Sequence, residues 1–403
     1  MLSAAVVSAT IGEAQGATAV KTVYRWPAEL VSGNNQFAID LYHQLSVEAG
    51  KPLFFSPYSI STALAMTYAG ARSDTATEMA KTLHFTLPPD QLHADYGAAL
   101  KQLTAAAPNH GYQFRIANRL WGQEGYKFLD SFFKITRDDY GAELAQLDFV
   151  HQAEQSRGTI NAWVEKETND KIKDLIPAGA LNADTRLVLT NAIYFKGDWQ
   201  LPFDKDSTQK APFHLTADKT ADVDMMSQQK HFNFARTDDA LLLEMPYKSG
   251  DLSMVVVLPT KVDGLPAVEK LFTAEAYGKW IAQLRSQTVH VWLPKFKATQ
   301  DFELGPTLGA MGMPAAFSAK TADFSGMDGK RDLFISSVIH KAFVDVDEKG
   351  TEAAAATGIV MHAGAILRRQ PPEEFKADHP FIFLLRDTRS GVILFLGRYL
   401  GPI

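Results

Sequence analysis

A short acidic stretch, Asp345-Val346-Asp347-Glu348-Lys349-Gly350, resembles the start of a calcium-binding loop. Such a loop supplies oxygen ligands at alternate positions and a bidentate glutamate at the twelfth. Here Lys349 occupies the fifth position and Ala356 the twelfth, so two required ligands are missing. The chain also has no cysteine, and its 11 histidines are dispersed. We therefore expect no metal site and no cofactor.

Hydrolytic chemistry would need a nucleophile and a base in a recognisable arrangement. Serine, histidine and aspartate all occur, but neither a G-x-S-x-G turn nor an H-E-x-x-H helix is present. No glycine-rich phosphate loop follows a predicted strand. His340 lies in the apolar pattern 338–343, where a hydrogen-bonded core histidine is more common than a base. We predict that the chain is not an enzyme and has no catalytic residues.

The run of small residues at 350–358 is suited to a change of conformation rather than to catalysis. Read as a strand, the segment places seven uncharged side chains on one face: Thr351, Ala353, Ala355, Thr357, Ile359, Met361 and Ala363. Glu352 points to the opposite face. Read as a helix, the same segment is capped by Thr351 and ended by Gly358. The local sequence leaves helix, loop and strand open, but a strand could enter a sheet without burying a charge.

The composition is that of an ordinary globular protein, with 403 residues, 46% hydrophobic and 21% charged. The net charge of −6 and the lack of a basic cluster argue against nucleic-acid binding. No apolar run is long enough to span a membrane. We expect a leader over 1–30 and one domain over 31–403. The apolar stretch 2–11 is typical of a truncated secretion signal or a disordered segment, which favours an extracellular or periplasmic location over a cytoplasmic one.

Hydrophobic periodicity places helices in the first half of the chain and strands in the second. Ser56-Pro57 predicts a helix start, and 160–176 predicts an amphipathic helix ended by Pro177. The last two predicted strands, 381–385 and 392–400, form a terminal hairpin. Helices followed by strands indicate an α+β fold.

Motifs from about Asn35 to Pro402 resemble the serpin family, in particular inhibitory members and bacterial serpins. In the family's order they are Phe54–Ile60, Ala117–Trp121, Leu189–Trp199, Pro246–Tyr247, Leu258–Pro259, Leu293–Phe296, Ala322–Met327 and His379–Phe383. The resemblance implies three β-sheets, eight or nine helices and an exposed reactive-centre loop, here about 348–374. A target serine protease cleaves that loop, which then inserts into the central sheet and carries the acylated protease with it. The resemblance also implies a monomer. Because the early helices carry no basic cluster, we expect no heparin-type activation.

The same resemblance assigns roles to two sets of residues. The hinge of the loop comprises Glu348, Gly350, Thr351, Ala353, Ala354, Ala355 and Ala356. A polar cluster beneath the sheet, the shutter, comprises Ser56, Ser59, Asn191 and His340. Gly350 supplies backbone freedom, and no proline or charge blocks the inward positions. These features predict an inhibitory member; the alternative is a non-inhibitory binding or carrier protein.

Two ways of counting place the scissile bond differently. Counted from Glu348, the bond is Gly364–Ala365, and the small apolar residues before it suit elastase-like or subtilisin-like proteases. Counted back from the prolines at 371–372, it is Arg368–Arg369, which suits trypsin-like proteases. We prefer the first count because the inserted length decides how far the protease is carried. Residues 351–363 span roughly 40 Å as a strand.

Overall fold

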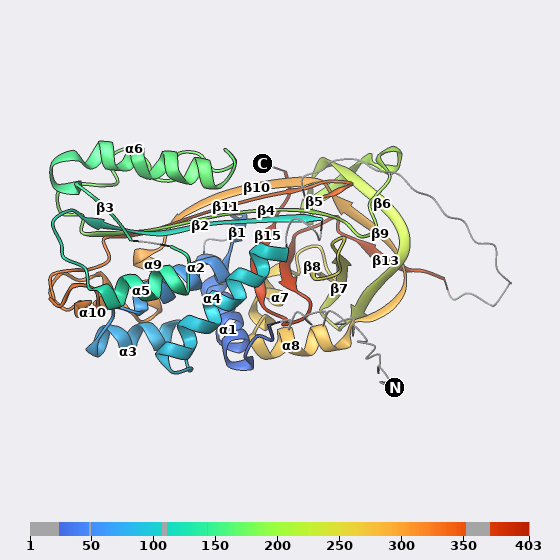
Figure 1. Ribbon diagram of the computed structural model, residues 1–403. Helices are drawn as coiled ribbons and strands as arrows, with labels where there is room; N and C mark the ends of the chain where they lie inside the picture. The colour runs from blue at the N-terminus through green and yellow to red at the C-terminus, as the bar shows by residue number, and fades with distance from the viewer. Residues whose placement is uncertain (1–23, 48–49, 107–110, 143, 352–370, 403) are drawn as a thin grey trace, which may run out of the picture.

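The computed structural model describes residues 24–47, 50–106, 111–142, 144–351 and 371–402 (Figure 1). Their helices and strands form the predicted α+β architecture. The α-helices are α1 Ala28–Leu45, α2 Pro57–Tyr68, α3 Ser73–Thr82, α4 Pro89–Ala106, α5 Asp130–Asp138, α6 Phe149–Glu167, α7 Leu265–Leu271, α8 Ala274–Gln283, α9 Gly305–Met311 and α10 Ser325–Asp328.

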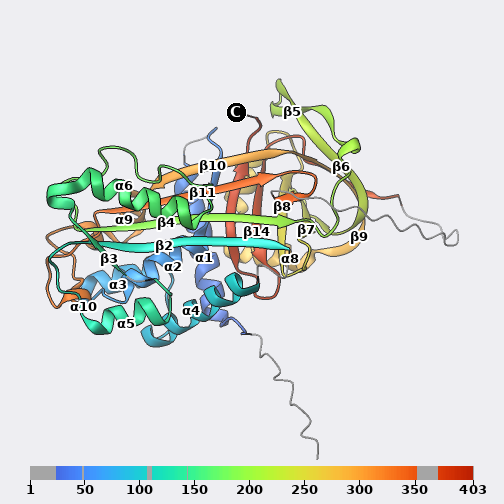
Figure 2. The ribbon, with the colours of Figure 1, turned by 45° about the horizontal axis from the view of Figure 1, so that its top comes forward.

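A six-stranded sheet runs through the middle of the molecule (Figures 1 and 2). In spatial order its strands are β10 Phe296–Glu303, β11 Ser337–Val346, β12 Gly350–Thr351, β4 Leu187–Asp198, β2 Tyr112–Gln123 and β3 Ala145–Leu147. Helix α6 lies over one face of this sheet, while α2, α4 and α5 lie on the other side. The two faces of the sheet are therefore packed against different helices.

Nine further strands form a second hydrogen-bonded network. They are β1 Leu53–Phe55, β15 Ile393–Tyr399, β14 Phe381–Asp387, β8 Leu252–Pro259, β7 Ala240–Pro246, β6 Lys219–Arg236, β9 Arg285–Pro294 and β13 Glu373–Lys376, with β5 Gln209–Thr216 paired to β6. The long strand β6 pairs with β7 only over 233–236 and with β9 over 225–234. The network thus has two parts joined by β6. Together with the six-stranded sheet they account for the three sheets that the sequence predicted.

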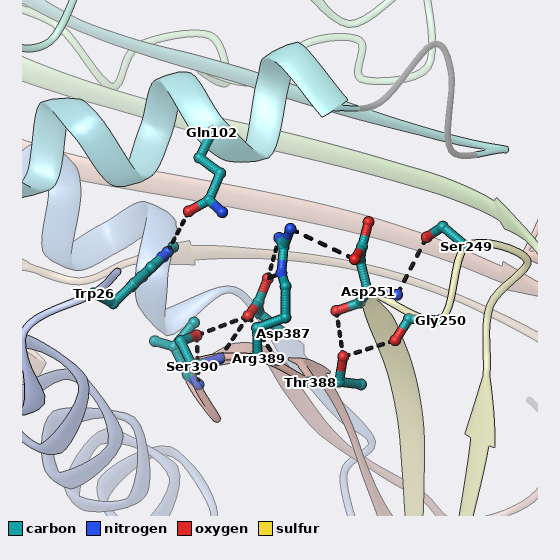
Figure 3. Close-up of polar contacts among 10 residues, drawn as sticks. Trp26, Gln102, Ser249, Gly250, Asp251, Asp387, Thr388, Arg389 and Ser390 are labelled. Atoms are coloured by element: carbon teal, nitrogen blue, oxygen red, sulfur yellow. Dashed lines mark hydrogen bonds and ion pairs between the residues drawn. The ribbon is translucent and has the colours of Figure 1, made fainter. Parts of the chain in front are cut away.

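Strands β14 and β15 form the predicted terminal hairpin, and a fully buried Asp387 holds its turn (Figure 3). The Asp387 carboxylate accepts hydrogen bonds from the backbone N–H groups of Arg389 and Ser390, at 3.1 and 2.8 Å. The Arg389 guanidinium pairs with the same carboxylate at 2.7 Å and reaches Asp251 at 3.5 Å. A charge buried this deeply is stable because it is both paired and hydrogen-bonded.

The predicted helix over 160–176 is wrong at both ends, because α6 begins at Phe149 and ends at Glu167, well before Pro177. Asn169 and Asp170 adopt the left-handed region, with φ of 52° and 58°, which asparagine and aspartate tolerate better than most residues. The side chain of Asn161 then binds the backbone N–H and C=O of Ile176 at 2.8 and 3.0 Å. The segment after α6 therefore folds back against the helix instead of extending it.

The packed part of the chain begins before the predicted boundary at residue 31. Trp26 is 8% exposed and donates a hydrogen bond to Gln102 Oε1 at 2.8 Å (Figure 3), and α1 starts at Ala28. The Trp26 ring packs against that of Tyr58 on α2, with 5.4 Å between the ring centroids. One domain over 31–403 stays a prediction. In the described ranges, no helix is both long and apolar enough to cross a bilayer.

Candidate functional site

The described part of the predicted site lies in two neighbouring places on the six-stranded sheet. Glu348, Gly350 and Thr351 lie where β4 and β11 separate, and the four predicted shutter residues meet beneath the sheet. The other predicted residues lie outside the described ranges: Ala353, Ala354, Ala355, Ala356, Gly364, Ala365, Arg368 and Arg369.

Strands β4 and β11 are hydrogen-bonded neighbours along only part of their length. They pair in parallel from Ser337 opposite Val188 to Phe343 opposite Tyr194. Beyond that point β12 lies between them: Thr351 pairs with Val346 of β11 and with Gly197 of β4, antiparallel to both. The first residues of the predicted loop are therefore already part of the sheet.

Gly350 is required by close approach to β4. A Cβ atom at this position would overlap the carbonyl oxygen of Gly197 and lie 2.7 Å from Cα of Asp198. Its φ of 153° is also rare for residues with side chains. From the sequence we expected Gly350 to supply backbone freedom; the structure adds that no side chain fits beside Gly197.

Thr351 is fully buried, as its place on the inward face of a strand predicts. Its hydroxyl lies 3.0 Å from Tyr247 Oη, and the Tyr247 ring stacks on Trp199 with 4.6 Å between centroids. The Trp199 backbone N–H donates to the Lys349 carbonyl at 2.7 Å. The Thr351 side chain thus lies beside two aromatic rings, and its hydroxyl bonds to that of Tyr247.

The carboxylates of the calcium-like stretch are all bound by protein groups. Asp345 pairs with Lys297 at 2.7 Å, and Asp347 accepts from the backbone N–H groups of Lys349 and Gly350. Glu348, whose side chain is 4% exposed, pairs with Lys295 at 2.9 Å and accepts from Thr208 Oγ1 at 2.8 Å. Burial alone would raise the pKa of Glu348, but these hydrogen bonds lower it below its ordinary value. Glu348 is therefore charged near neutral pH and holds the base of the loop.

Three buried polar residues form a row across adjacent strands, which we call the polar row. Asn118 of β2 lies opposite Asn191 of β4, and Asn191 lies opposite His340 of β11. The N-terminus of α2 lies below the row, where Ser56 caps the helix by accepting from the Ser59 backbone N–H at 3.2 Å. The four predicted shutter residues therefore do meet, and Asn118 joins them.

The hydrogen bonds of the polar row fix the tautomer of His340. The Ser56 backbone N–H donates to Nε2 at 3.0 Å, so Nε2 carries no proton and Nδ1 donates to Asn191 Oδ1. Asn191 Nδ2 donates to Ser59 Oγ at 2.6 Å and to Asn118 Oδ1. Complete burial lowers the pKa of His340 to about 3, so the ring is neutral in the native state.

Asn118 was missed by the sequence analysis, although a signal for it existed. In β2, Phe114 and Leu120 are buried on the face that carries Asn118. A polar residue that interrupts an apolar face needs a buried partner, and Asn191 in the family-like motif 189–199 is a candidate of matching chemistry. The register between the two strands was not predictable from spacing alone.

Burial of neutral histidines predicts that stability falls with acidity. Above pH 6.5 His340 is neutral in both the native and the unfolded state, so its full contribution to the free energy of unfolding is present. Between pH 6.5 and about pH 3 only the unfolded state binds the proton, and this contribution is progressively lost. His93, whose pKa burial lowers to about 4, acts in the same direction. We expect a loss of roughly 1.4 kcal/mol per pH unit for each histidine. Urea unfolding between pH 6.5 and 4.5 should show a shallower pH slope for His340→Gln than for the wild type; equal slopes would contradict the assignment.

Comparisons with known proteins identify what the chain is similar to. A family model described as "Serpin (serine protease inhibitor)" matches residues 32–402. Leukocyte elastase inhibitor A of Rattus norvegicus is 43% identical over 383 residues, covering 93% of this chain and 100% of the relative. Leukocyte elastase inhibitor of Bos taurus is 44% identical over 385 residues, with the same coverage. The crystal structure of uncleaved ovalbumin is 32% identical, with a TM-score of 0.83, and covers 93% of this chain and 100% of ovalbumin.

Proposed function

Because this chain belongs to the serpin family of serine protease inhibitors, we propose that it traps an elastase-like or subtilisin-like protease as a suicide substrate. The chain is an inhibitor and not an enzyme. The observation that carries the proposed mechanism is β12, which lies between β4 and β11 and occupies the start of the space that a cleaved loop would fill. The elastase-like preference rests on the named relatives and on the apolar residues before Gly364. A non-inhibitory carrier role is not favoured.

The register of β12 supports a specific path for the inserted loop. Thr351 lies opposite both Gly197 and Val346, so each further residue pairs one position back along β4 and β11. Continued antiparallel pairing after cleavage brings Thr357 between Asn191 and His340, which are themselves opposite each other. The threonine hydroxyl would then bind the two polar groups that strand separation leaves unpaired. The small side chains at 353–356 would fit between β4 and β11 where the rings of Tyr194 and Phe343 are stacked.

We propose Gly364–Ala365 as the scissile bond, with Arg368–Arg369 as the alternative. The protein should be incubated separately with leukocyte elastase, subtilisin and trypsin. The mass of the released C-terminal fragment is then measured by mass spectrometry. A fragment that starts at Ala365 supports the hinge count and an elastase-like or subtilisin-like target. A fragment that starts at Arg369, released only by trypsin, would overturn both.

We further propose that the inhibitor is an extracellular or periplasmic monomer that needs no heparin-type activator. The location rests on the apolar stretch 2–11, and the absence of activation rests on scattered Lys and Arg residues. Size-exclusion chromatography and inhibition rates with and without heparin test the last two statements. Elution at the size of a dimer would contradict the monomer, and a heparin-dependent rise in the association rate would contradict the lack of an activator.

A further inference from the structure

One face of the strands β6, β9 and β13 carries a continuous set of polar and aromatic side chains, which we call the docking face. It comprises Ser227, Gln229, His231, Thr288, His290, Trp292, Glu374 and Lys376. The register aligns them in rows: Ser227, Trp292 and Lys376 form one. The alternate residues Val289, Val291 and Phe375 are buried in the core. These three strands lie together at one end of the molecule (Figure 1).

The centre of the docking face is a preformed aromatic pair. The rings of His290 and Trp292 are stacked with 3.6 Å between their centroids, and Ser227 Oγ lies 2.9 Å from His290 Nε2. Both rings are half-buried, so one surface of the pair is held by neighbours while the rest faces solvent. Glu374 lies opposite His290 on β13 and is exposed. Lys376, opposite Trp292, is paired with Asp378 at 2.9 Å. With that charge neutralised, an aromatic surface beside the Glu374 carboxylate suits an arginine or lysine side chain of a partner.

Covalent geometry limits how far from this face a loop-bound protease can lie. Glu373 begins β13, and a chain from Ala365 to Glu373 spans at most about 28 Å, while one from Arg369 spans at most about 14 Å. A protease domain of roughly 200 residues has a radius of gyration of about 16 Å. A protease held at either candidate bond is therefore tethered within about its own diameter of β13.

We propose that the docking face is a secondary contact surface for the target protease and that the Trp292–His290 pair receives a basic side chain from its rim. The proposal rests on the inhibitory function proposed above. The reactive loop would provide cleavage specificity, while the docking face would speed association. The chain's net charge of −6 also favours association with a basic partner.

The test measures association rate constants with leukocyte elastase for the wild type and for Trp292→Ala. We expect Trp292→Ala to associate roughly tenfold more slowly, in the range of aromatic hot spots, with an unchanged number of inhibitor molecules consumed per protease. Gln229→Trp, a change at an exposed position that should not disturb folding, should also slow association. The matched control is His151→Ala on α6, whose side chain is 79% exposed, and it should keep the wild-type rate.

The outcomes separate this proposal from the proposed function. Wild-type association rates for both Trp292→Ala and Gln229→Trp, with SDS-stable complexes still formed, would overturn the docking face and leave the inhibitor intact. Absence of any stable complex for the wild type would overturn the inhibitory function and this surface with it. Slower association with complexes of normal stability supports both.

Discussion

Replacing Thr351 by arginine should convert the protein from an inhibitor into a substrate. Thr351 is fully buried between β4 and β11, with its hydroxyl against Tyr247. An unpaired guanidinium at this place would leave water without a counter-charge, so the substitution would keep position 351 out of the sheet and make insertion of the loop strongly unfavourable. The protease would complete hydrolysis before the loop enters the sheet. We expect the number of inhibitor molecules consumed per inactivated protease to rise from about one to more than about ten, as active-site titration would measure.

The adjacent residue provides a matched control. By strand alternation, position 352 faces the side of the sheet opposite to position 351, and the register places it beside Lys196 and Asp345 in the inserted state. Glu352→Arg should therefore keep inhibition close to the wild-type level. If both variants inhibit equally well, the buried position of Thr351 is not what controls insertion.

Replacing Asn191 by alanine should be the most destabilising change in the polar row. Asn191 bonds to His340, Ser59 and Asn118. Its removal leaves the Nδ1–H group of His340 without a partner, while Ser59 and Asn118 each lose one hydrogen bond but keep the bond between them. The unsatisfied group costs roughly 1 to 3 kcal/mol and each of the two lost hydrogen bonds about 1 kcal/mol, so we expect the free energy of unfolding to fall by about 3 to 5 kcal/mol. Urea unfolding monitored by circular dichroism measures this change.

Asn182 offers a control of the same residue type. It is exposed, and its side chain accepts one hydrogen bond from the exposed backbone N–H of Asp184 at 2.8 Å. Asn182→Ala should cost less than about 1 kcal/mol. Equal losses for the two variants would show that the polar row contributes no more to stability than a surface amide.

Local chemistry made parts of this structure predictable. Ser56 followed by Pro57 specifies a capped helix start, and α2 begins at Pro57 with Ser56 as its cap. Strand alternation placed Thr351 inward, and the structure buries it. In the turn 387–391 the Asp387 side chain accepts from the backbone N–H groups of Arg389 and Ser390, and the terminal hairpin was also correctly predicted.

The failures concern interactions between distant segments. The end of α6 depends on Asn161 binding Ile176, which periodicity cannot reveal. The role of Asn118 depends on the register of β2 against β4, and the steric need for Gly350 depends on the backbone of Gly197. The helices α7 to α10 are short and lie among strands, so the pattern of helices first and strands later concealed them.

The most direct test of loop insertion is the thermal unfolding midpoint before and after a single cleavage within 361–366. A strand inserted between β4 and β11 gains backbone hydrogen bonds on both sides and fills the space that β12 only begins to occupy. We expect the cleaved protein, with its fragment still bound, to unfold tens of degrees above the intact protein. An unchanged or lower midpoint after cleavage would contradict it.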